Sequence, residues 1–367
     1  MEQLPCDNQV RTLLDPIVPS HFDPVFVEVF ERLAQHHMLD SFRVLGDQLF
    51  VSLDGTHYFS SKAIHCQNCL TRQLSNGHTR YYHPAITPVV VCPGRSQVIA
   101  LPPEYIMPQD GHDKQDCEQV AGKRWIRKHA DAIAPHQVTF LGDDLYSKQP
   151  CCALALQKGF NFILVCKPDS HPKLYERLAF WQAHDGMAAC ARRRWHGRFT
   201  EVTLYRSVND VLLQDGKDAL SVNWFEITVV NAKTGEQLYH KSCITNHRVT
   251  AEHVAEVARA GRGRWKIENE NNNVLTTKGY HLEHNFGHGK QYLSAVMLSL
   301  NLLAFLFHTV LEWSDDQYAL LRRVLARRQT FFDDIRALTR YLVFDSWGHL
   351  IDFMIRGLEL QSQPDTS

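Results

Sequence analysis

Two short apolar runs in the first half of the chain each lead into an acidic residue. Residues 49–53 (Leu-Phe-Val-Ser-Leu) precede Asp54, and residues 138–141 (Val-Thr-Phe-Leu) lead through Gly142 into Asp143. Runs of this length that are rich in aliphatic and β-branched residues predict buried strands. A carboxylate at the end of a strand points into the crevice where open α/β sheets place their ligands. We therefore expect the chemistry of this protein at these two strand ends.

The segments around these runs predict a mixed sheet flanked by helices. Residues 85–92 and 96–101 have the pattern of a hairpin, and with the first strand they predict an antiparallel meander. Apolar positions at helical spacing then alternate with short apolar runs, which is typical of parallel strands joined by helices. The expected fold class is therefore α/β, or α+β. The further predicted elements are helices at 24–45, 113–134 and 151–159, a strand at 160–166 and a loop at 61–84.

Residues 190–248 interrupt this alternation and predict a β-rich insertion. Alternating positions at 199–205 and 224–230 predict strands, and a turn after the second leads to a partner strand at 237–244. From Thr250 the chain is predicted to be helical to its end. The predicted parts are an N-terminal arm and helix (1–45), the first part of a catalytic core (46–189), the insertion (190–248), the last part of the core (249–310) and a C-terminal helical region (311–367).

The composition is that of an ordinary globular chain and excludes several classes of protein. Hydrophobic residues make up 44% and charged residues 22% of the 367 positions, with a net charge of −1. The chain has no overall excess of basic residues that would indicate nucleic-acid binding. A prediction of such binding must therefore rest on local clusters of basic residues. Ten cysteines without an export signal predict reduced thiols in a cytoplasmic protein. The most apolar stretch, 292–310, contains Ser294, Ser299, Asn301 and His308, which favours a buried core helix over a membrane span.

A third acidic residue, Glu268, completes a candidate metal site. It lies in a predicted helix, so the three carboxylates come from two strand ends and one helix. Two Mg²⁺ ions held by a few carboxylates are suited to phosphoryl transfer, because one activates the attacking oxygen and the other stabilises the leaving oxygen. Other assignments stay open at each position. Asp54 also fits a turn, Asp144 competes with Asp143, and Glu270 competes with Glu268.

The sequence around these acids resembles the DDE transposases of bacterial insertion sequences over residues 45–310. Residues 53–55 (Leu-Asp-Gly) resemble the family's first-Asp strand, and residues 143–148 (Asp-Asp-Leu-Tyr-Ser-Lys) resemble its Asp-x-x-Tyr motif. Residues 264–269 (Arg-Trp-Lys-Ile-Glu-Asn) resemble its Arg-Trp-x-Ile-Glu-Asn block. The resemblance implies a ribonuclease-H-like mixed sheet flanked by helices, with a β-rich insertion before the catalytic Glu helix. The catalytic residues and ligands of Mg²⁺ or Mn²⁺ that it implies are Asp54, Asp143 and Glu268.

The resemblance also implies a function, partners and a location. The expected reaction is metal-dependent cleavage of DNA at the transposon ends, followed by transfer of the cut strand into target DNA. The expected partners are DNA and a second copy of the chain, with no membrane, in the bacterial cytoplasm and at the nucleoid when DNA is bound. Two departures keep alternatives open: Gly261 stands where the family has Tyr, and Leu275 where it has Lys, with Lys278 nearest. The alternatives are a metal nuclease on the same fold without strand transfer and an inactive DNA-binding remnant.

Two further sets of side chains are candidates for binding. Basic residues near the Glu block and in the run 192–198, which includes a Trp, fit contacts with phosphates and an unpaired base. The predicted DNA-binding residues are Arg259, Arg262, Arg264, Lys266, Arg193, Arg194 and Lys278. The second set combines Cys66 and Cys69 with His78 and His83 in the pattern of a tetrahedral Zn²⁺ site, although a plain loop with reduced thiols is the favoured interpretation.

Overall fold

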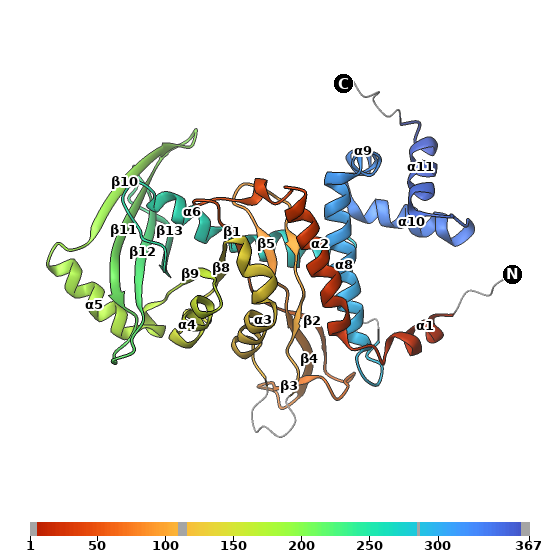
Figure 1. The fold of residues 1–367 in the computed structure, drawn as a ribbon, viewed down its shortest axis with the longest axis horizontal. Helices are drawn as coiled ribbons and strands as arrows, with labels where there is room; N and C mark the ends of the chain where they lie inside the picture. The colour runs from red at the N-terminus through yellow and green to blue at the C-terminus, as the bar shows by residue number, and fades with distance from the viewer. Residues whose placement is uncertain (1–5, 109–115, 285–286, 361–367) are drawn as a thin grey trace. The chain divides into compact units, whose positions relative to one another are not determined.

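The computed structural model describes residues 6–108, 116–284 and 287–360. Contacts divide the chain into two compact units. Unit 1 is built from three stretches, Met1–Asp23, His57–His83 and Asn269–Ser367, and unit 2 from two, Pro24–Thr56 and Pro84–Glu268. The chain therefore passes back and forth between the units. Figure 1 colours it by residue number, from red at the N-terminus to blue at the C-terminus. This division differs from the five predicted parts, because those were drawn as consecutive stretches.

The main sheet of unit 2 is mixed and has nine strands in the order β10-β11-β12-β13-β9-β8-β1-β5-β6. Strand β1 pairs antiparallel with β5, which pairs antiparallel with β6, and this confirms the predicted meander. On its other side β1 runs parallel to β8, and β8 runs parallel to β9, as the alternation of helices and strands predicts. The central strands are β1 (Leu49–Ser52), β5 (Val89–Val91), β6 (Ile99–Ala100), β8 (Val138–Gly142) and β9 (Asn161–Val165).

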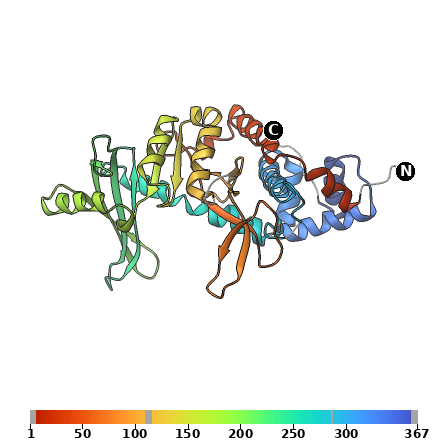
Figure 2. The same ribbon diagram turned by 90° about the horizontal axis from the view of Figure 1, so that it is seen from below.

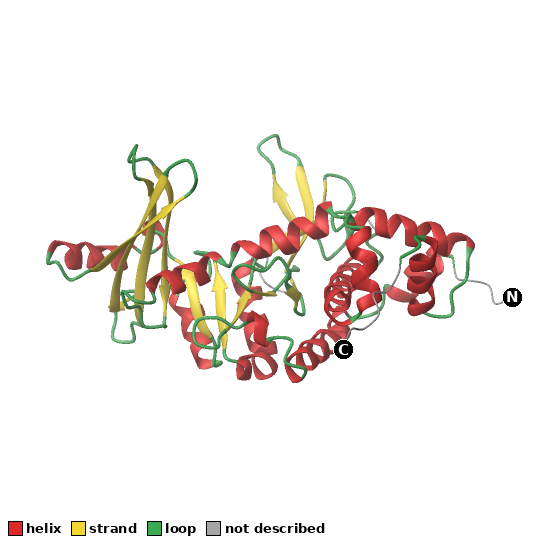
Figure 3. Ribbon diagram, turned by 90° about the horizontal axis from the view of Figure 1, so that it is seen from above, coloured by secondary structure: helices red, strands yellow, loops and turns green. Residues whose placement is uncertain are grey.

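Helices cover both faces of the central strands (Figure 3). The covering helices are α3 (Glu118–Ile133), α4 (Gln149–Gln157) and α6 (Val254–Arg262). On one face Phe140 of β8 packs edge-on against Tyr146, which in turn lies against Gly122 of α3. On the other face Ile163 of β9 lies against Gly261 of α6. Strands that are covered on both sides carry apolar residues at nearly every position, which explains why all residues of β1 and β8 are buried.

The predicted β-rich insertion is confirmed, and it extends the main sheet. Its strands form an antiparallel meander, and β13 pairs antiparallel with β9 at the edge of the central strands. They are longer than the central strands and are drawn in green in Figure 2. The strands are β10 (Ala188–Trp195), β11 (Thr200–Leu212), β12 (Ser221–Asn231) and β13 (Gln237–Thr245), preceded by α5 (Pro172–Ala183). The pattern does not reveal β10, because almost all of its residues are exposed and no apolar alternation marks it.

Two helices of unit 2 differ at their ends from the prediction. α2 (Asp23–Gln35) is shorter than the predicted 24–45, because the chain turns at His37, which has a φ of 59°. Such a φ is uncommon for a residue with a side chain and does not occur within a right-handed helix. Residues 113–115 of the helix predicted at 113–134 lie outside the described residues. Of the remaining predicted residues, 116–134, α3 covers 118–133.

The prediction of a loop at 61–84 is wrong in part, because residues 70–73 and 79–84 form strands, whereas residues 62–69 and 74–78 are loop and turn. This stretch contributes to a second sheet with the order β2-β4-β3, and β7 pairs with the end of β4. The strands are β2 (Gly55–Ser61), β3 (Leu70–Gln73), β4 (Thr79–Ile86) and β7 (Glu104–Tyr105). Three of the four residues of β3 are exposed, so no apolar run marks this strand in the sequence.

Unit 1 is largely helical, as predicted for the end of the chain. Its helices are α1 (Asp7–Leu14), α7 (Asn273–Thr277), α8 (Leu293–Ser314), α9 (Asp316–Val324), α10 (Arg328–Tyr341) and α11 (Trp347–Gly357). The last three share an apolar core that includes Tyr318, Phe331 and Ile351. α8 has the length and composition of a membrane span, with a mean hydropathy of 1.8 in its most apolar window. More than half of that window (56%) is buried inside the protein, as expected of a core helix, so α8 is weak evidence for a membrane.

Candidate active site

Asp54 and Asp143 follow the ends of two neighbouring parallel strands, and we infer that their side chains lie on the same face of the sheet. Ser52 of β1 and Leu141 of β8 are cross-strand partners. Oγ of Ser52 donates a hydrogen bond to the backbone oxygen of Arg264, 3.5 Å away, so this pair faces the segment that follows α6. Side chains alternate between the two faces of a strand, so the residues two positions later return to that face. The structure therefore brings the two predicted aspartates together, on the side of Arg264.

Four acidic side chains and one arginine interact at this end of the sheet. Burial raises the pKa of Asp54 to about 7, and the guanidinium of Arg264 opposes this change. The carboxylates that add to it are Glu118, Glu268 and Asp143. A partly buried cluster of like charges is unfavourable unless cations compensate it. The site is thus electrostatically suited to bind a divalent cation.

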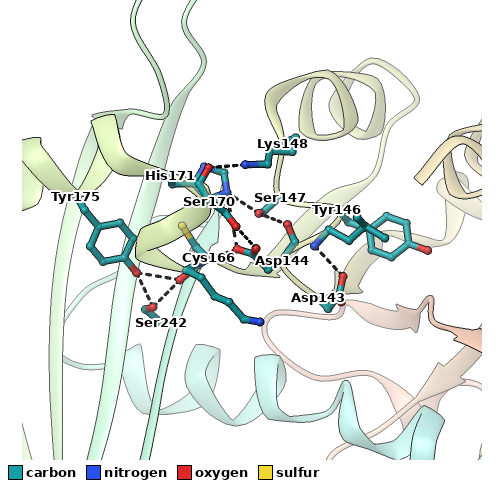
Figure 4. Close-up of polar contacts among 12 residues, drawn as sticks. Asp143, Asp144, Tyr146, Ser147, Lys148, Cys166, Ser170, His171, Tyr175 and Ser242 are labelled. Atoms are coloured by element: carbon teal, nitrogen blue, oxygen red, sulfur yellow. Dashed lines mark hydrogen bonds and ion pairs between the residues drawn. The ribbon is translucent and has the colours of Figure 1, made fainter. Parts of the chain in front are cut away.

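The contacts of Asp143 and Asp144 separate their roles (Figure 4). Asp144 accepts hydrogen bonds from the backbone N–H of Lys167, at 2.7 Å, and from the hydroxyl of Ser170. It therefore ties the loop after β8 to the loop after β9. Oδ1 of Asp143 accepts a hydrogen bond from the backbone N–H of Leu145 at 2.8 Å, which holds this carboxylate at the strand end. Asp144 is thus engaged in holding the two loops, and Asp143 is the candidate metal ligand.

Glu268 lies in a π-helical turn, Ile267–Asn272, that follows α6. Such turns are rare and occur frequently at functional sites. Nη2 of Arg264 lies 3.0 Å from Oε1 of Glu268, and Arg264 is only 8% exposed. Among the predicted DNA-binding residues, Arg264 is therefore placed to hold Glu268, and its burial makes it less accessible to DNA than an exposed arginine.

The sequence does not reveal Glu118, the fourth carboxylate of the site. Glu118 opens α3, and its Oε1 accepts hydrogen bonds from the backbone N–H of Gly55 (3.2 Å) and from the hydroxyl of Tyr146 (3.0 Å). Burial also raises the pKa of Glu118. A Cβ at Gly55 would lie 2.5 Å from Oε2 of Glu118, so a glycine after Asp54 lets the two segments approach. The signal in the sequence is this Asp-Gly pair, which is equally typical of a turn.

Basic side chains line a groove of about 820 Å³ between the strands of the insertion and α6. Glu201, an acid in the lining, is paired with His196 at 2.8 Å. The basic residues of the groove include the predicted Arg193, Arg194, Arg259, Arg262 and Lys266, together with Arg192. The groove thus concentrates positive charge in a chain whose net charge is −1. The predicted Lys278 belongs to unit 1, where it is exposed at the end of α7.

A separate group of side chains in unit 1 has the geometry of a metal site. One ligand atom from each of Cys66, Cys69, His83 and His288 lies within 4.8 Å of all the others. The structure thus brings together three of the four residues that the sequence indicates. The fourth, His78, is exposed in the turn between β3 and β4 and is not a member of the group. His288 takes its place, from a position far along the chain.

Two features of unit 2 define what its site can do chemically. The crowded carboxylates can hold divalent cations, and the basic groove can hold a polyanion. Neither feature alone identifies a reaction.

Comparison of the chain with models of known protein families and with curated proteins finds no match.

Proposed function

We propose that the protein is a DNA transposase of the DDE type, which cuts DNA at transposon ends and joins the cut strand to target DNA. The observation that carries the proposal is that Asp54 and Asp143 follow neighbouring parallel strands and interact electrostatically, together with Glu268 and Arg264. Glu268, the third acid of the sequence resemblance, is ion-paired with that arginine. Half-buried acids that repel one another cost stability, so their convergence favours a functional role.

The order of the central strands supports a ribonuclease-H-like core. Three antiparallel strands, β6, β5 and β1, are followed by two parallel ones, β8 and β9. α3 connects the two sets, and α4 connects the parallel pair. The strands β10 to β13 lie between Asp143 and Glu268 in the chain, as the resemblance implies for the insertion. This core is therefore part of the proposed assignment.

The residues present fit Mg²⁺ or Mn²⁺. Carboxylate oxygens are the hard ligands that these ions prefer, and Asp54, Asp143 and Glu268 would hold them. When bound, the ions activate the attacking oxygen and stabilise the leaving oxygen of phosphoryl transfer. Burial and the neighbouring acids raise the pKa of Asp54 to about 7, as expected where negative charge lacks compensation. Arg264 supplies one positive charge and orients Glu268.

The basic groove beside α6 would hold the DNA backbone. Its lining includes Lys266, two residues before Glu268, so the groove and the carboxylates share one segment. Lys and Arg bind phosphates by neutralising their charge, and an exposed aromatic residue can stack on an unpaired base. Trp195 and Trp265 are exposed (64% and 46%) on the two basic segments. In the proposed complex two copies of the chain hold the two transposon ends, in the bacterial cytoplasm.

A joining assay tests the proposal directly. The substrate is a labelled duplex taken from the DNA that borders the gene, and a supercoiled plasmid serves as target. With Mg²⁺ we expect cleavage of the duplex and a joined product, and EDTA should suppress both. Asp143→Asn should lower both rates at least ~10²-fold, since one preorganised charge is lost at the reacting phosphate. Asp131→Asn, on an exposed position of α3, is the matched control and should leave both rates unchanged.

The products of this assay separate the proposal from its rivals. Cleavage without a joined product would replace it with a metal nuclease on the same core. DNA binding without cleavage, with Mg²⁺ or Mn²⁺ present, would favour an inactive remnant. Cleavage that survives Asp143→Asn would remove the assignment of the site.

Replacing two arginines of the groove should weaken DNA binding to a similar extent for every DNA sequence. Arg194 and Arg259 line the groove from a strand and from a helix. Each phosphate contact contributes about 0.9 to the slope of log K against log salt concentration, so Arg194→Ala/Arg259→Ala should reduce that slope by about 2. Fluorescence anisotropy at several salt concentrations measures it. Arg32→Ala, which removes a guanidinium paired with Glu28, is the control; an unchanged slope in the groove variant would rule out the groove as the DNA site.

A further inference from the structure

Four side-chain atoms in unit 1 lie close together without a covalent bond between them. Nε2 of His83 lies 3.3 Å from Sγ of Cys66, 3.3 Å from Sγ of Cys69 and 3.2 Å from Nδ1 of His288. The two sulfur atoms are 3.9 Å apart, and Sγ of Cys69 is 3.9 Å from Nδ1 of His288. All four atoms, including Sγ of Cys66 and Nδ1 of His288, lie within 4.8 Å of one another, so they cannot be coplanar at these distances and form a small tetrahedron.

The separations are those expected around a zinc ion. With Zn–S bonds of about 2.3 Å and Zn–N bonds of about 2.0 Å, tetrahedral geometry places S and S about 3.8 Å apart, S and N about 3.5 Å apart, and N and N about 3.3 Å apart. The corresponding distances here are 3.9 Å, 3.3 to 3.9 Å, and 3.2 Å. Two cysteines and two histidines are also a common ligand set of structural zinc. We propose that Cys66, Cys69, His83 and His288 form a structural Zn²⁺ site.

A disulfide or a hydrogen-bonded network would fit these distances less well. A disulfide requires a sulfur–sulfur bond of about 2.0 Å, whereas the two Sγ atoms are 3.9 Å apart. In a hydrogen-bonded network, Nε2 of His83 would have at most one proton for three neighbours within 3.3 Å. A metal ion engages the lone pairs of all four atoms at once.

The surroundings favour a closed, structural site. Cys69, His83 and His288 are buried, with exposures of 6%, 3% and 9%. The ring of Phe59 stands edge-on to His288 at 4.1 Å, and Tyr58 stacks on His83 at 5.6 Å. Four protein ligands leave no open position for a substrate, which distinguishes structural zinc from catalytic zinc. The ion would therefore stabilise the fold of unit 1.

The turn that carries the two cysteines presents both sulfur atoms. The backbone N–H of Cys69 donates to the carbonyl of Cys66 at 3.2 Å, and the backbone N–H of Cys66 donates to Sγ of Cys69 at 3.4 Å. Gln67 and Asn68, between the cysteines, donate side-chain hydrogen bonds to the backbone carbonyls of residues 290 and 291. The turn is thus tied to the segment that supplies the fourth ligand.

A metal ion here joins two of the three stretches that make up unit 1. Its first three ligands lie in His57–His83 and the fourth in Asn269–Ser367, and 205 positions separate His83 from His288. A cross-link between such distant residues removes much entropy from the unfolded chain, and the free energy of binding adds to that of folding. We expect loss of zinc to loosen unit 1.

Metal content and a cobalt spectrum test the site in the full-length protein. Protein purified under reducing conditions should contain one Zn²⁺ per chain by elemental analysis. Replacing zinc with Co²⁺ should give the visible absorption of tetrahedral cobalt and a thiolate-to-metal charge-transfer band, because both ions take the same ligands. Cys69→Ser and His288→Asn should each lower zinc affinity at least ~10-fold. His78→Asn, the exposed histidine of the same hairpin, is the matched control and should keep one Zn²⁺ and the same spectrum.

Chelation should also change stability. It should lower the midpoint of thermal unfolding of the wild-type protein and of His78→Asn, and lower that of His288→Asn less, because that variant binds the ion more weakly. The site is overturned if reduced wild-type protein binds neither Zn²⁺ nor Co²⁺, a result that does not depend on the folding of any variant. It is also overturned if the double variant Cys69→Ser/His288→Asn keeps the wild-type cobalt spectrum. The same holds if His78→Asn loses zinc while His288→Asn keeps it. None of these readouts depends on the proposed transposase activity.

Discussion

Asparagine in place of Asp54 is expected to abolish Mg²⁺-dependent DNA cleavage while making the metal-free protein more stable. Burial and the neighbouring acids Glu118, Glu268 and Asp143 raise the pKa of this carboxyl to about 7. Asparagine keeps the size of the side chain and removes the charge. A residue with a purely structural role loses stability when it is replaced, so a gain in stability together with a loss of activity marks a functional residue.

The sign of the stability change follows from the direction of the pKa change. A carboxyl whose pKa is higher in the folded protein than in the unfolded chain lowers the stability as the pH rises between the two values. For Asp54 this interval runs from the ordinary value of 3.8 to about 7, so the full cost is present above pH 7. The difference corresponds to ~4 kcal/mol at most, and solvent screening at a partly exposed site reduces it to on the order of 1 to 3 kcal/mol. We expect that gain for Asp54→Asn above about pH 7 and little gain near about pH 4.

Denaturant unfolding without divalent metal, at the two pH values, measures the stability, and the joining assay measures the activity. Cleavage should fall at least ~10²-fold. Added Mg²⁺ should raise the unfolding free energy of the wild-type protein and leave Asp54→Asn unchanged, because a ligand that binds only the folded state stabilises it. Asp131→Asn is the control for the loss of an exposed acid. A variant at Asp54 that is less stable at the higher pH and cuts DNA normally would contradict the assignment.

Alanine in place of Gly122 is expected to destabilise unit 2 and to reduce activity with it. Gly122 lies inside α3, where alanine is normally favoured over glycine by ~1 kcal/mol. A Cβ at this position would overlap Cε1 of Tyr146. Tyr146 is fully buried, packs on Phe140 and donates a hydrogen bond to Glu118 at 3.0 Å, so it cannot move without losing these contacts. Overpacking should therefore outweigh the better helix propensity and cost on the order of 1 to 3 kcal/mol.

Chemical unfolding measures this loss against a matched glycine. Gly357 ends α11, and a Cβ there would have no neighbour within 4 Å, so Gly357→Ala should be as stable as the wild-type protein or slightly more stable. Cleavage by Gly122→Ala should fall as well, because Tyr146 holds Glu118 beside Asp54. If Gly122→Ala unfolds at the wild-type denaturant concentration, the packing between α3 and the loop after β8 is looser than described.

The central strands could be predicted because both of their faces are covered, which leaves an unbroken apolar run in the sequence. β1 and β8 show this most clearly, with every residue buried. β3 and β10 carry no such run, since they are mostly exposed and are held by backbone pairing with one neighbouring strand. That pairing depends on the partner strand, and the pattern of a single exposed segment does not encode it.

The candidate sites divide in the same way. Asp54 and Asp143 could be predicted, because each follows a recognisable strand and parallel neighbours bring their ends together. Glu118 could not, since an acid at the start of a helix is common and its contact with Gly55 is visible only in the fold. His288 is one of 21 histidines, and 205 positions separate it from His83, so nothing local links the two. His78 is nearer in the sequence, but nearness along the chain does not place it beside the cysteines.

The interrupted architecture of unit 1 sets an order of events on the ribosome. Unit 2 has all of its residues once Glu268 is synthesised, and domains generally fold as units during synthesis. Unit 1 also needs Asn269–Ser367, so the three proposed zinc ligands in His57–His83 emerge well before His288. At about 5 to 20 residues per second, the delay is on the order of 10 to 40 seconds. For the proposed site to form, the two thiols of the nascent chain must stay reduced throughout that interval, until His288 is synthesised.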